Sequence, residues 1–205
     1  MLNLIINKPD IGEVLDETCF GGLPAVPADE DVSWPVCNTC ELPMQFLGQF
    51  KVENELLLIF MCQNDPGMCD DWDPESGDNK VIKVPVKNLV KLSAPEEGED
   101  TVRDTRYGIT VVEIEAENYY EARDKWANIN QASKSEVLGL LFGEPTWIQA
   151  DDTPKCNDCG NLMRFVAQFE SGPDPKTQMN FGDGGYGYLF DCTCGTNSAK
   201  FLWQN

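Results

Sequence analysis

Eight of the nine cysteines in this chain fall into two groups of four, and each group opens with a Cys-x-x-Cys pair. The groups are Cys37, Cys40, Cys62 and Cys69, then Cys156, Cys159, Cys192 and Cys194. This spacing is typical of a zinc ribbon, in which two short turns bring four thiolates onto one tetrahedral ion. Four thiolates leave no open coordination position, so we expect two structural Zn²⁺ ions and no catalytic metal.

Other uses of these cysteines stay open at this point. They include disulfides, a thioredoxin-like redox pair and the ligands of an iron–sulfur cluster. A redox pair would not explain two complete groups. The first residues do not resemble a secretory signal, so we expect a cytoplasmic protein with reduced thiols, which favours zinc over disulfides. Cys19 is left over, and we expect it to pack as a small core residue.

The two cysteine groups lie in a repeated stretch of sequence. Residues 37–50 and 156–169 share the pattern Cys-x-x-Cys-x-x-x-Met-x-Phe-x-x-Gln-Phe. Each copy continues into an apolar segment that ends at the third cysteine of its group. Agreement at so many positions indicates an internal repeat. We therefore expect two homologous halves, residues 1–92 and 141–205, joined by an acidic linker, a strand and a helix over residues 93–140.

Hydrophobic periodicity predicts strands over residues 44–52, 55–62, 81–92 and 107–115, and a helix over residues 118–129. The residues expected on the buried face of that helix are Tyr119, Ala122, Trp126 and Ile129. Residues 135–141 are expected to add a helical turn, and residues 93–104 to form a mobile acidic linker. The predicted fold class is a β-rich α+β protein, in which each half is a β-hairpin or sheet module with a zinc-ribbon-like four-cysteine site.

Two glutamines lie within the apolar patterns of their strands. Gln49 and Gln168 occupy the same position in the two copies of the repeat. A buried amide requires hydrogen-bond partners, so we expect each glutamine to anchor a neighbouring backbone segment.

The charge balance limits the partners. The chain has 35 acidic and 15 basic residues, a net charge of −20, which disfavours nucleic acid and anionic membranes as partners. No histidine is present, which excludes Ser–His–Asp and Cys–His catalysis and histidine-ligated metal sites. No run of 18 apolar residues indicates a membrane-spanning helix. A basic protein client is the partner that this charge favours.

Residues 70–78 contain most of the candidate partner-binding side chains. They are Asp70, Asp71, Asp73, Glu75 and Asp78. Three of them alternate as in a calcium-binding EF-hand loop, but Ile82 stands where that loop needs a bidentate glutamate. We therefore expect a solvated loop or a docking surface for basic groups. The glycine-rich residues 181–188 are expected to form a hairpin turn, with Tyr186 as an exposed candidate contact.

The repeated elements resemble a known family. The Gly-x-Pro-x-Trp-Ile-Gln element that begins at Gly143, the Cys-x-x-Cys pair, the Phe-x-x-Gln-Phe strand and the closing residues 201–204 resemble the bacterial YwqG-like family. The paired cysteine turns in two halves are also similar to eukaryotic programmed-cell-death-2-like proteins. The resemblance covers residues 19–92 and 141–205. It implies a β-rich architecture of two related halves, with chaperoning of a basic ribosomal protein in the eukaryotic relatives and an immunity role in some bacterial ones.

These observations together predict a non-enzymatic, acidic, zinc-binding interaction module with a basic client. The client is either a toxin that the module neutralises or a ribosomal protein that it escorts. Two alternatives stay open: an enzyme that uses carboxylates or Cys19, and a structural or regulatory zinc protein without a stable client.

Overall fold

The computed structural model describes residues 1–98, 100–174 and 178–205. Its strands are β1 (Leu2–Lys8), β2 (Cys19–Phe20), β3 (Ala25–Pro27), β4 (Gln45–Val52), β5 (Glu55–Met61), β6 (Asn79–Pro85), β7 (Leu89–Lys91), β8 (Tyr107–Ile114), β9 (Val137–Leu141), β10 (Arg164–Glu170), β11 (Tyr186–Asp191) and β12 (Ala199–Gln204). Helix α1 spans Tyr119–Asn130, and a 3₁₀ turn spans Lys134–Glu136. No helix in these ranges is long and apolar enough to cross a membrane.

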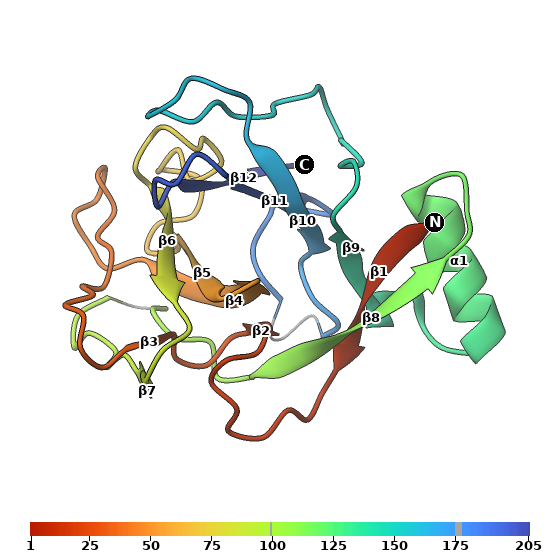
Figure 1. Cartoon of the computed structure of the whole chain (residues 1–205), viewed down its shortest axis with the longest axis horizontal. Helices are drawn as coiled ribbons and strands as arrows, with labels where there is room; N and C mark the ends of the chain where they lie inside the picture. The colour runs from red at the N-terminus through yellow and green to blue at the C-terminus, as the bar shows by residue number, and fades with distance from the viewer. Residues whose placement is uncertain (99, 175–177) are drawn as a thin grey trace.

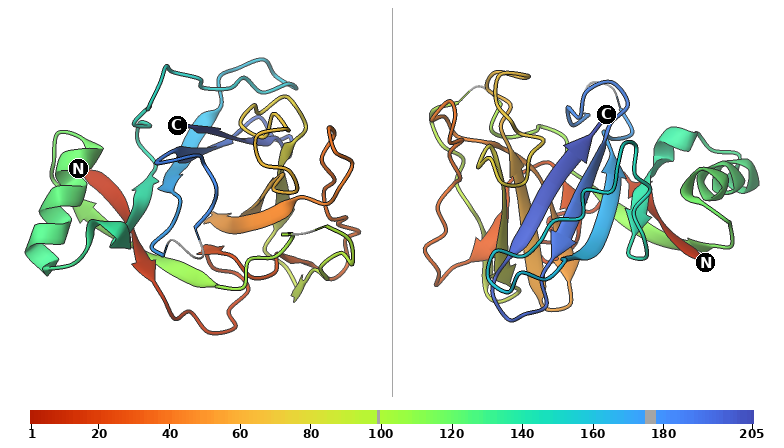
Figure 2. Two further views of the ribbon diagram at one scale, coloured as in Figure 1. Left: turned by 180° about the vertical axis from the view of Figure 1, so that it is seen from behind. Right: turned by 90° about the horizontal axis from the view of Figure 1, so that it is seen from above.

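Ten of the strands form one sheet, in the order β12-β11-β10-β9-β1-β8-β2-β4-β5-β6. The sheet curls until its two edge strands, β6 and β12, contact each other, so the molecule is β-rich with a nearly closed, barrel-like sheet (Figure 1). Helix α1 packs outside this sheet against β1 and β9 (Figure 2). Strands β3 and β7 form a separate two-stranded sheet.

The strand order on the two sides of the central β1–β8 pair is matched. From β8 outward run β2, β4, β5 and β6, and from β1 outward run β9, β10, β11 and β12. The β4–β5 register shifts between Phe46 and Gly48, and the β10–β11 register shifts between Phe165 and Ala167. The two bulges fall at equivalent positions of the repeated sequence, so both copies of the repeat adopt the same local structure.

Apolar side chains form one core inside the curled sheet and two outside it. The inner core includes Phe50 and Phe169, whose rings stack with centroids 5.5 Å apart. Residues preceding β4 cover the outer face of β4–β6, while α1 and the segment around Trp147 cover the outer face of β9–β12. Strand β5 is therefore buried on both faces, which explains its continuous apolar sequence.

The two repeated glutamines connect these covering segments to the sheet. Gln49 Oε1 accepts a hydrogen bond from the Ala25 amide at 3.0 Å, and its Nε2 donates to the carbonyls of Leu15 and Glu17 at 2.7 and 3.0 Å. Gln168 Oε1 accepts from the backbone amide of residue 146 at 2.6 Å. The prediction that both amides anchor a neighbouring backbone segment is confirmed.

Sheet pairing overrides local helical tendency in residues 135–141. The predicted helical turn is limited to the 3₁₀ turn, and the chain then enters β9, which pairs with both β1 and β10. The helix prediction for residues 118–129 is confirmed within one residue, and Asn118 caps it by accepting the Glu121 amide. Ile129 is 67% exposed, so its placement on the buried face is wrong; the buried face of α1 ends at Ala127.

The acidic segment 93–104 forms a loop, as predicted, and its described residues up to 100 are mostly exposed, but its end is packed against the sheet and is not a free linker. Thr101 and Arg103 are buried, and the Thr101 carbonyl accepts the Phe46 amide at 3.0 Å. Glu99 lies outside the described residues. Strand β1 also pairs with β8 and β9 of the middle of the chain, so one sheet runs through residues 1–92, 93–140 and 141–205.

Replacing Gln49 with alanine should lower the free energy of unfolding by about 3 kcal/mol, because three backbone groups lose their partner in a buried place. Equilibrium urea unfolding measures the change. The matched control is Gln45→Ala in the same strand, whose surface hydrogen bond to the Asp100 carbonyl is worth less than about 1 kcal/mol. Equal losses for the two variants would show that Gln49 is not an anchor.

Candidate metal centres

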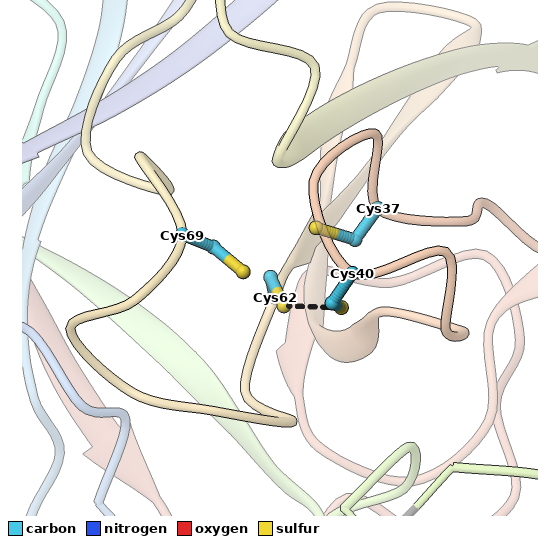
Figure 3. A group of neighbouring side chains, drawn as sticks. All are labelled: Cys37, Cys40, Cys62 and Cys69. Atoms are coloured by element: carbon cyan, nitrogen blue, oxygen red, sulfur yellow. Dashed lines mark hydrogen bonds between the residues drawn. The ribbon is translucent and has the colours of Figure 1, made fainter.

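The first group of cysteines gathers from three separate pieces of chain. Cys37 and Cys40 lie in the turn before β4, Cys62 follows β5, and Cys69 lies in the loop between β5 and β6 (Figure 3). Figure 3 shows the four side chains directed toward a common centre. Their Sγ atoms all lie within 4.8 Å of one another, and those of Cys40 and Cys62 are 3.6 Å apart.

The second group gathers from two pieces of chain. Cys156 and Cys159 lie in the turn before β10, while Cys192 and Cys194 follow β11. Their Sγ atoms also lie within 4.8 Å of one another. The Cys156–Cys194 and Cys159–Cys192 sulfur distances are 3.8 and 3.7 Å.

These distances fit one tetrahedral ion in each group. Four sulfurs placed about 2.3 Å from a central Zn²⁺ are separated by about 3.8 Å. A disulfide needs about 2.05 Å between sulfurs, and all nine cysteines are free thiols. Sulfurs that all lie within 4.8 Å of one another suit a single ion better than a cluster of several irons and sulfides, whose cysteine ligands bind different irons. The prediction that these cysteines form two groups able to hold a metal is confirmed.

Each Cys-x-x-Cys turn is closed by the same backbone hydrogen bonds. In the first turn the Cys37 amide donates to the Leu42 carbonyl at 2.9 Å, and the Glu41 amide donates to the Cys37 carbonyl at 3.0 Å. The second turn repeats both bonds, each at 2.9 Å. Glu41 and its counterpart Gly160 both have a positive φ, of 59° and 71°. Glycine adopts this conformation without strain and glutamate does not, so the second turn is the less strained of the two.

The two groups differ in burial. Three of the four cysteines in the first group are buried, whereas Cys159 and Cys194 in the second group are exposed. Burial raises the pKa of Cys69 to about 12, and backbone amides, chiefly that of Cys159, lower the pKa of Cys156 to about 6. The second group also contains a raised thiol, because the Cys194 side chain raises the pKa of Cys192 to about 12. Metal binding must therefore displace thiol protons in both groups.

The loop over residues 63–78, here called the acidic loop, is held by a buried carboxylate. Asp78 Oδ1 accepts the Thr39 amide at 3.0 Å, and Oδ2 accepts the Thr39 hydroxyl at 2.7 Å and the Asp70 amide at 2.9 Å. Asp78 therefore connects the Cys37–Cys40 turn to the segment that carries Cys69. The sequence analysis missed this role because nothing local distinguishes Asp78 from its acidic neighbours.

The structure corrects three of the candidate partner-binding residues. Asp71, Asp78 and Tyr186 are only 5%, 1% and 7% exposed, so they cannot form part of a docking surface. Tyr186 packs edge-on against Tyr119 beneath α1, which explains why the prediction that it is exposed was wrong. Asp70 and Glu75 are exposed, and Asp73 is half-buried at the surface.

The carboxylates of the acidic loop do not converge on a calcium ion. Asp71 accepts the Trp203 indole N–H at 3.3 Å, Asp73 accepts the Glu75 amide at 2.8 Å, and Glu75 pairs with Lys200. Within residues 1–98, 100–174 and 178–205, the convergent groups of three or more cysteines and carboxylates are the two cysteine groups. The EF-hand interpretation therefore finds no support.

Cys19 lies in the interior, as predicted. It is fully buried in β2, and burial raises the pKa of its thiol. A substrate cannot reach this sulfur in the observed fold, and a protonated thiol is a weak nucleophile.

A charged network near the meeting edges of the sheet was missed. Lys83 Nζ lies 2.8 Å from Glu55 and 2.9 Å from Asp191, and Arg164 pairs with the other oxygen of Asp191 at 2.9 Å. Asp191 is nearly inaccessible and connects β11 to β6. Its position directly before Cys192, in an otherwise apolar strand, was the available signal.

Comparisons with known proteins identify no family for this chain. No protein-family model matches the chain, and no curated protein is significantly similar to it.

Replacing Cys159 with serine should remove one of two bound metal ions and lower the melting temperature, because the remaining three sulfurs no longer enclose the ion. Metal content per chain and thermal unfolding measure the two effects, and Cys69→Ser is the equivalent change in the first group. The control is Cys19→Ala, which should keep both ions. Full metal content and an unchanged melting temperature in Cys159→Ser would refute the metal assignment for the second group.

Burial, with the nearby charges of Asp78 and Asp70, raises the pKa of Asp71 to about 7. The pKa of an unfolded aspartate is about 3.9, so the stability that protonation provides is fully present below that value and is lost as the pH rises through 7. Asp71→Asn should therefore raise the free energy of unfolding by about 3 kcal/mol at pH 8, with a gain that shrinks steadily toward pH 5.

Urea unfolding at several pH values measures this dependence. The control is Asp31→Asn, which changes an exposed carboxylate outside the acidic loop. A gain for Asp71→Asn that does not depend on pH would contradict the expected titration.

Proposed function

We propose that this chain is a non-catalytic zinc protein that captures a basic protein client. One Zn²⁺ would occupy each group of four cysteines. The observation that carries the proposal is the closure of both groups: in each, four sulfurs lie within 4.8 Å of one another, with 3.6–3.8 Å between Cys40 and Cys62, Cys156 and Cys194, and Cys159 and Cys192. Four such sulfurs around one ion leave no position for a substrate or water. The metals would therefore have a structural role and no catalytic one.

We further propose that the two halves are homologous and that each is a zinc-ribbon-like module. The shared pattern of residues 37–50 and 156–169 supports this proposal. So do the matched bulges, the matched turns and the matched glutamine anchors. This similarity accords with the resemblance to the YwqG-like and programmed-cell-death-2-like families.

The charge supports a basic client. The net charge of −20 gives a long-range attraction that speeds encounter with a positively charged protein and weakens as salt is added. Asp70, Asp73 and Glu75 lie at the surface of the acidic loop, which Cys69 and Asp78 fix in place. The client would be a toxin in an immunity role or a ribosomal protein in a chaperone role, and its identity separates the two. The free state of all nine thiols fits a cytoplasmic location.

Neutralising two carboxylates of the acidic loop should weaken client capture more than the same change of charge elsewhere. The test uses the tagged, metal-loaded protein, with retained proteins identified by mass spectrometry after washes at low and high salt. Asp70→Asn with Asp73→Asn should lose most of a basic client that the unchanged protein retains near stoichiometrically at low salt, because the loop loses two of the three carboxylates Asp70, Asp73 and Glu75.

The matched control carries Glu30→Gln and Asp31→Asn, two exposed residues outside the loop, and should retain the client. Equal losses from both double variants would show that only total charge matters. No basic protein retained at either salt concentration would refute the client proposal and return attention to a metal-stabilised protein without a stable partner.

A further inference from the structure

A pocket of about 300 Å³ lies between the acidic loop and the last strand. Its lining residues are Trp72, Asp73, Pro74, Glu75, Gln149, Asp152, Pro154, Leu202, Trp203 and Gln204. One wall therefore comes from the first half of the chain and the other wall from the second half. A volume of this size lies at the lower end of the range for ligand pockets and suits a single long side chain.

The pocket is acidic, and among the residues that the structure describes no lysine or arginine lines it. Three carboxylates do, and two of them, Asp73 and Asp152, form no salt bridge with any residue that the structure describes. The neighbouring groove between β6 and β12 has the opposite character, because Lys80, Lys83 and Lys200 line it. The Trp72 pocket is therefore a place where a cation would be attracted locally and not only by the net charge.

The pocket also presents an aromatic surface. Trp72 is 51% exposed although it is among the largest apolar side chains. An exposed tryptophan beside unpaired carboxylates is unusual for a solvated loop, since burying its ring would be favourable. A planar cation can stack on the ring and bond the carboxylates at the same time.

Hydrogen bonds hold both walls in position before any ligand arrives. On the loop side, the Trp203 amide donates to the Trp72 carbonyl at 3.4 Å, and the Trp203 indole donates to Asp71 at 3.3 Å. On the opposite side, Gln204 Nε2 donates to Asp152 Oδ2 at 3.0 Å and to the Ala150 carbonyl at 2.9 Å. Such preorganisation reduces the entropy lost on binding.

We propose that this pocket binds the guanidinium group of an arginine side chain. Arginine fits better than lysine because its planar fork stacks on an aromatic ring and matches a carboxylate with two hydrogen bonds, whereas an ammonium is a compact, strongly hydrated charge. The identity of the molecule that presents the arginine rests on the proposed function, in which it is the basic client; the binding of the group itself does not.

Acetyl-Gly-Arg-Gly-amide is the probe, and the metal-loaded full chain is the protein. The tripeptide is titrated while two-dimensional ¹H–¹⁵N spectra record the indole N–H signals of the five tryptophans. The signal of Trp72, identified by its loss in Trp72→Ala, should move and saturate with a dissociation constant in about the millimolar range, as expected for a ligand of this size. The same peptide with citrulline, which keeps the shape and lacks the charge, should bind at least about tenfold more weakly, as the loss of one charge-assisted contact implies.

Variants locate the site. Trp72→Ala should abolish saturable binding, read from the remaining indole and backbone signals, and Asp152→Asn should weaken it at least about fivefold. Asp183→Asn removes an exposed carboxylate that does not line the pocket and should leave binding unchanged. Metal content is measured for each variant, so a loss of binding with both ions present cannot be assigned to unfolding.

Three results would overturn the proposal: citrulline binding as tightly as arginine, Trp72→Ala binding as tightly as the unchanged protein, or a lysine tripeptide binding as tightly as the arginine one. Its failure is distinguishable from that of the proposed function. Client capture that survives in Trp72→Ala leaves the client intact and refutes the pocket as its anchor. Saturable binding of the arginine peptide without any captured client keeps the pocket and refutes the client.

Discussion

Each group of four cysteines requires separate pieces of chain to meet at one point, and much of the molecule depends on this requirement. In the first half, the turn before β4, the end of β5 and the acidic loop converge on the sulfurs of Cys37, Cys40, Cys62 and Cys69. Such a loop has few apolar contacts of its own, so a bound ion would supply the free energy that orders it. The ordered loop then brings Trp72 and Glu75 to the second half of the chain.

The contact between the two edge strands of the sheet is a second feature that involves the ordered loop and its neighbours. Strands β6 and β12 contact each other without pairing, and the Lys83–Asp191 ion pair connects β6 to β11 near this edge. Lys83 and Asp191 are almost wholly removed from water. A buried ion pair contributes little net stability, but it fixes which groups face each other. Covering the edges in this way also protects them from pairing with another chain.

The sequence predicted the parts of this fold that local pattern controls. The hairpin β4–β5, helix α1, the two cysteine groups and the anchoring role of Gln49 all follow from periodicity or spacing within a few dozen residues. Strand β9 and the packing of residues 101–103 did not follow, because each is stabilised by partners far away in the chain. The burial of Asp71, Asp78 and Tyr186 was missed for the same reason. An acidic or glycine-rich segment is predicted to be exposed to solvent, because the residues that bury it lie far away in the sequence.

What the sequence by itself determined is therefore the chemistry available: two four-thiolate groups, no histidine, a strong excess of acid and a repeated strand pattern. Tertiary structure alone decided how these groups are used. It set the sulfur atoms at distances suited to one ion, turned some acidic side chains inward to support the loop and left others beside an exposed tryptophan. The physical reason is that ligand geometry and burial depend on contacts between residues distant in sequence, such as Asp71 with Trp203, and no local pattern encodes those contacts.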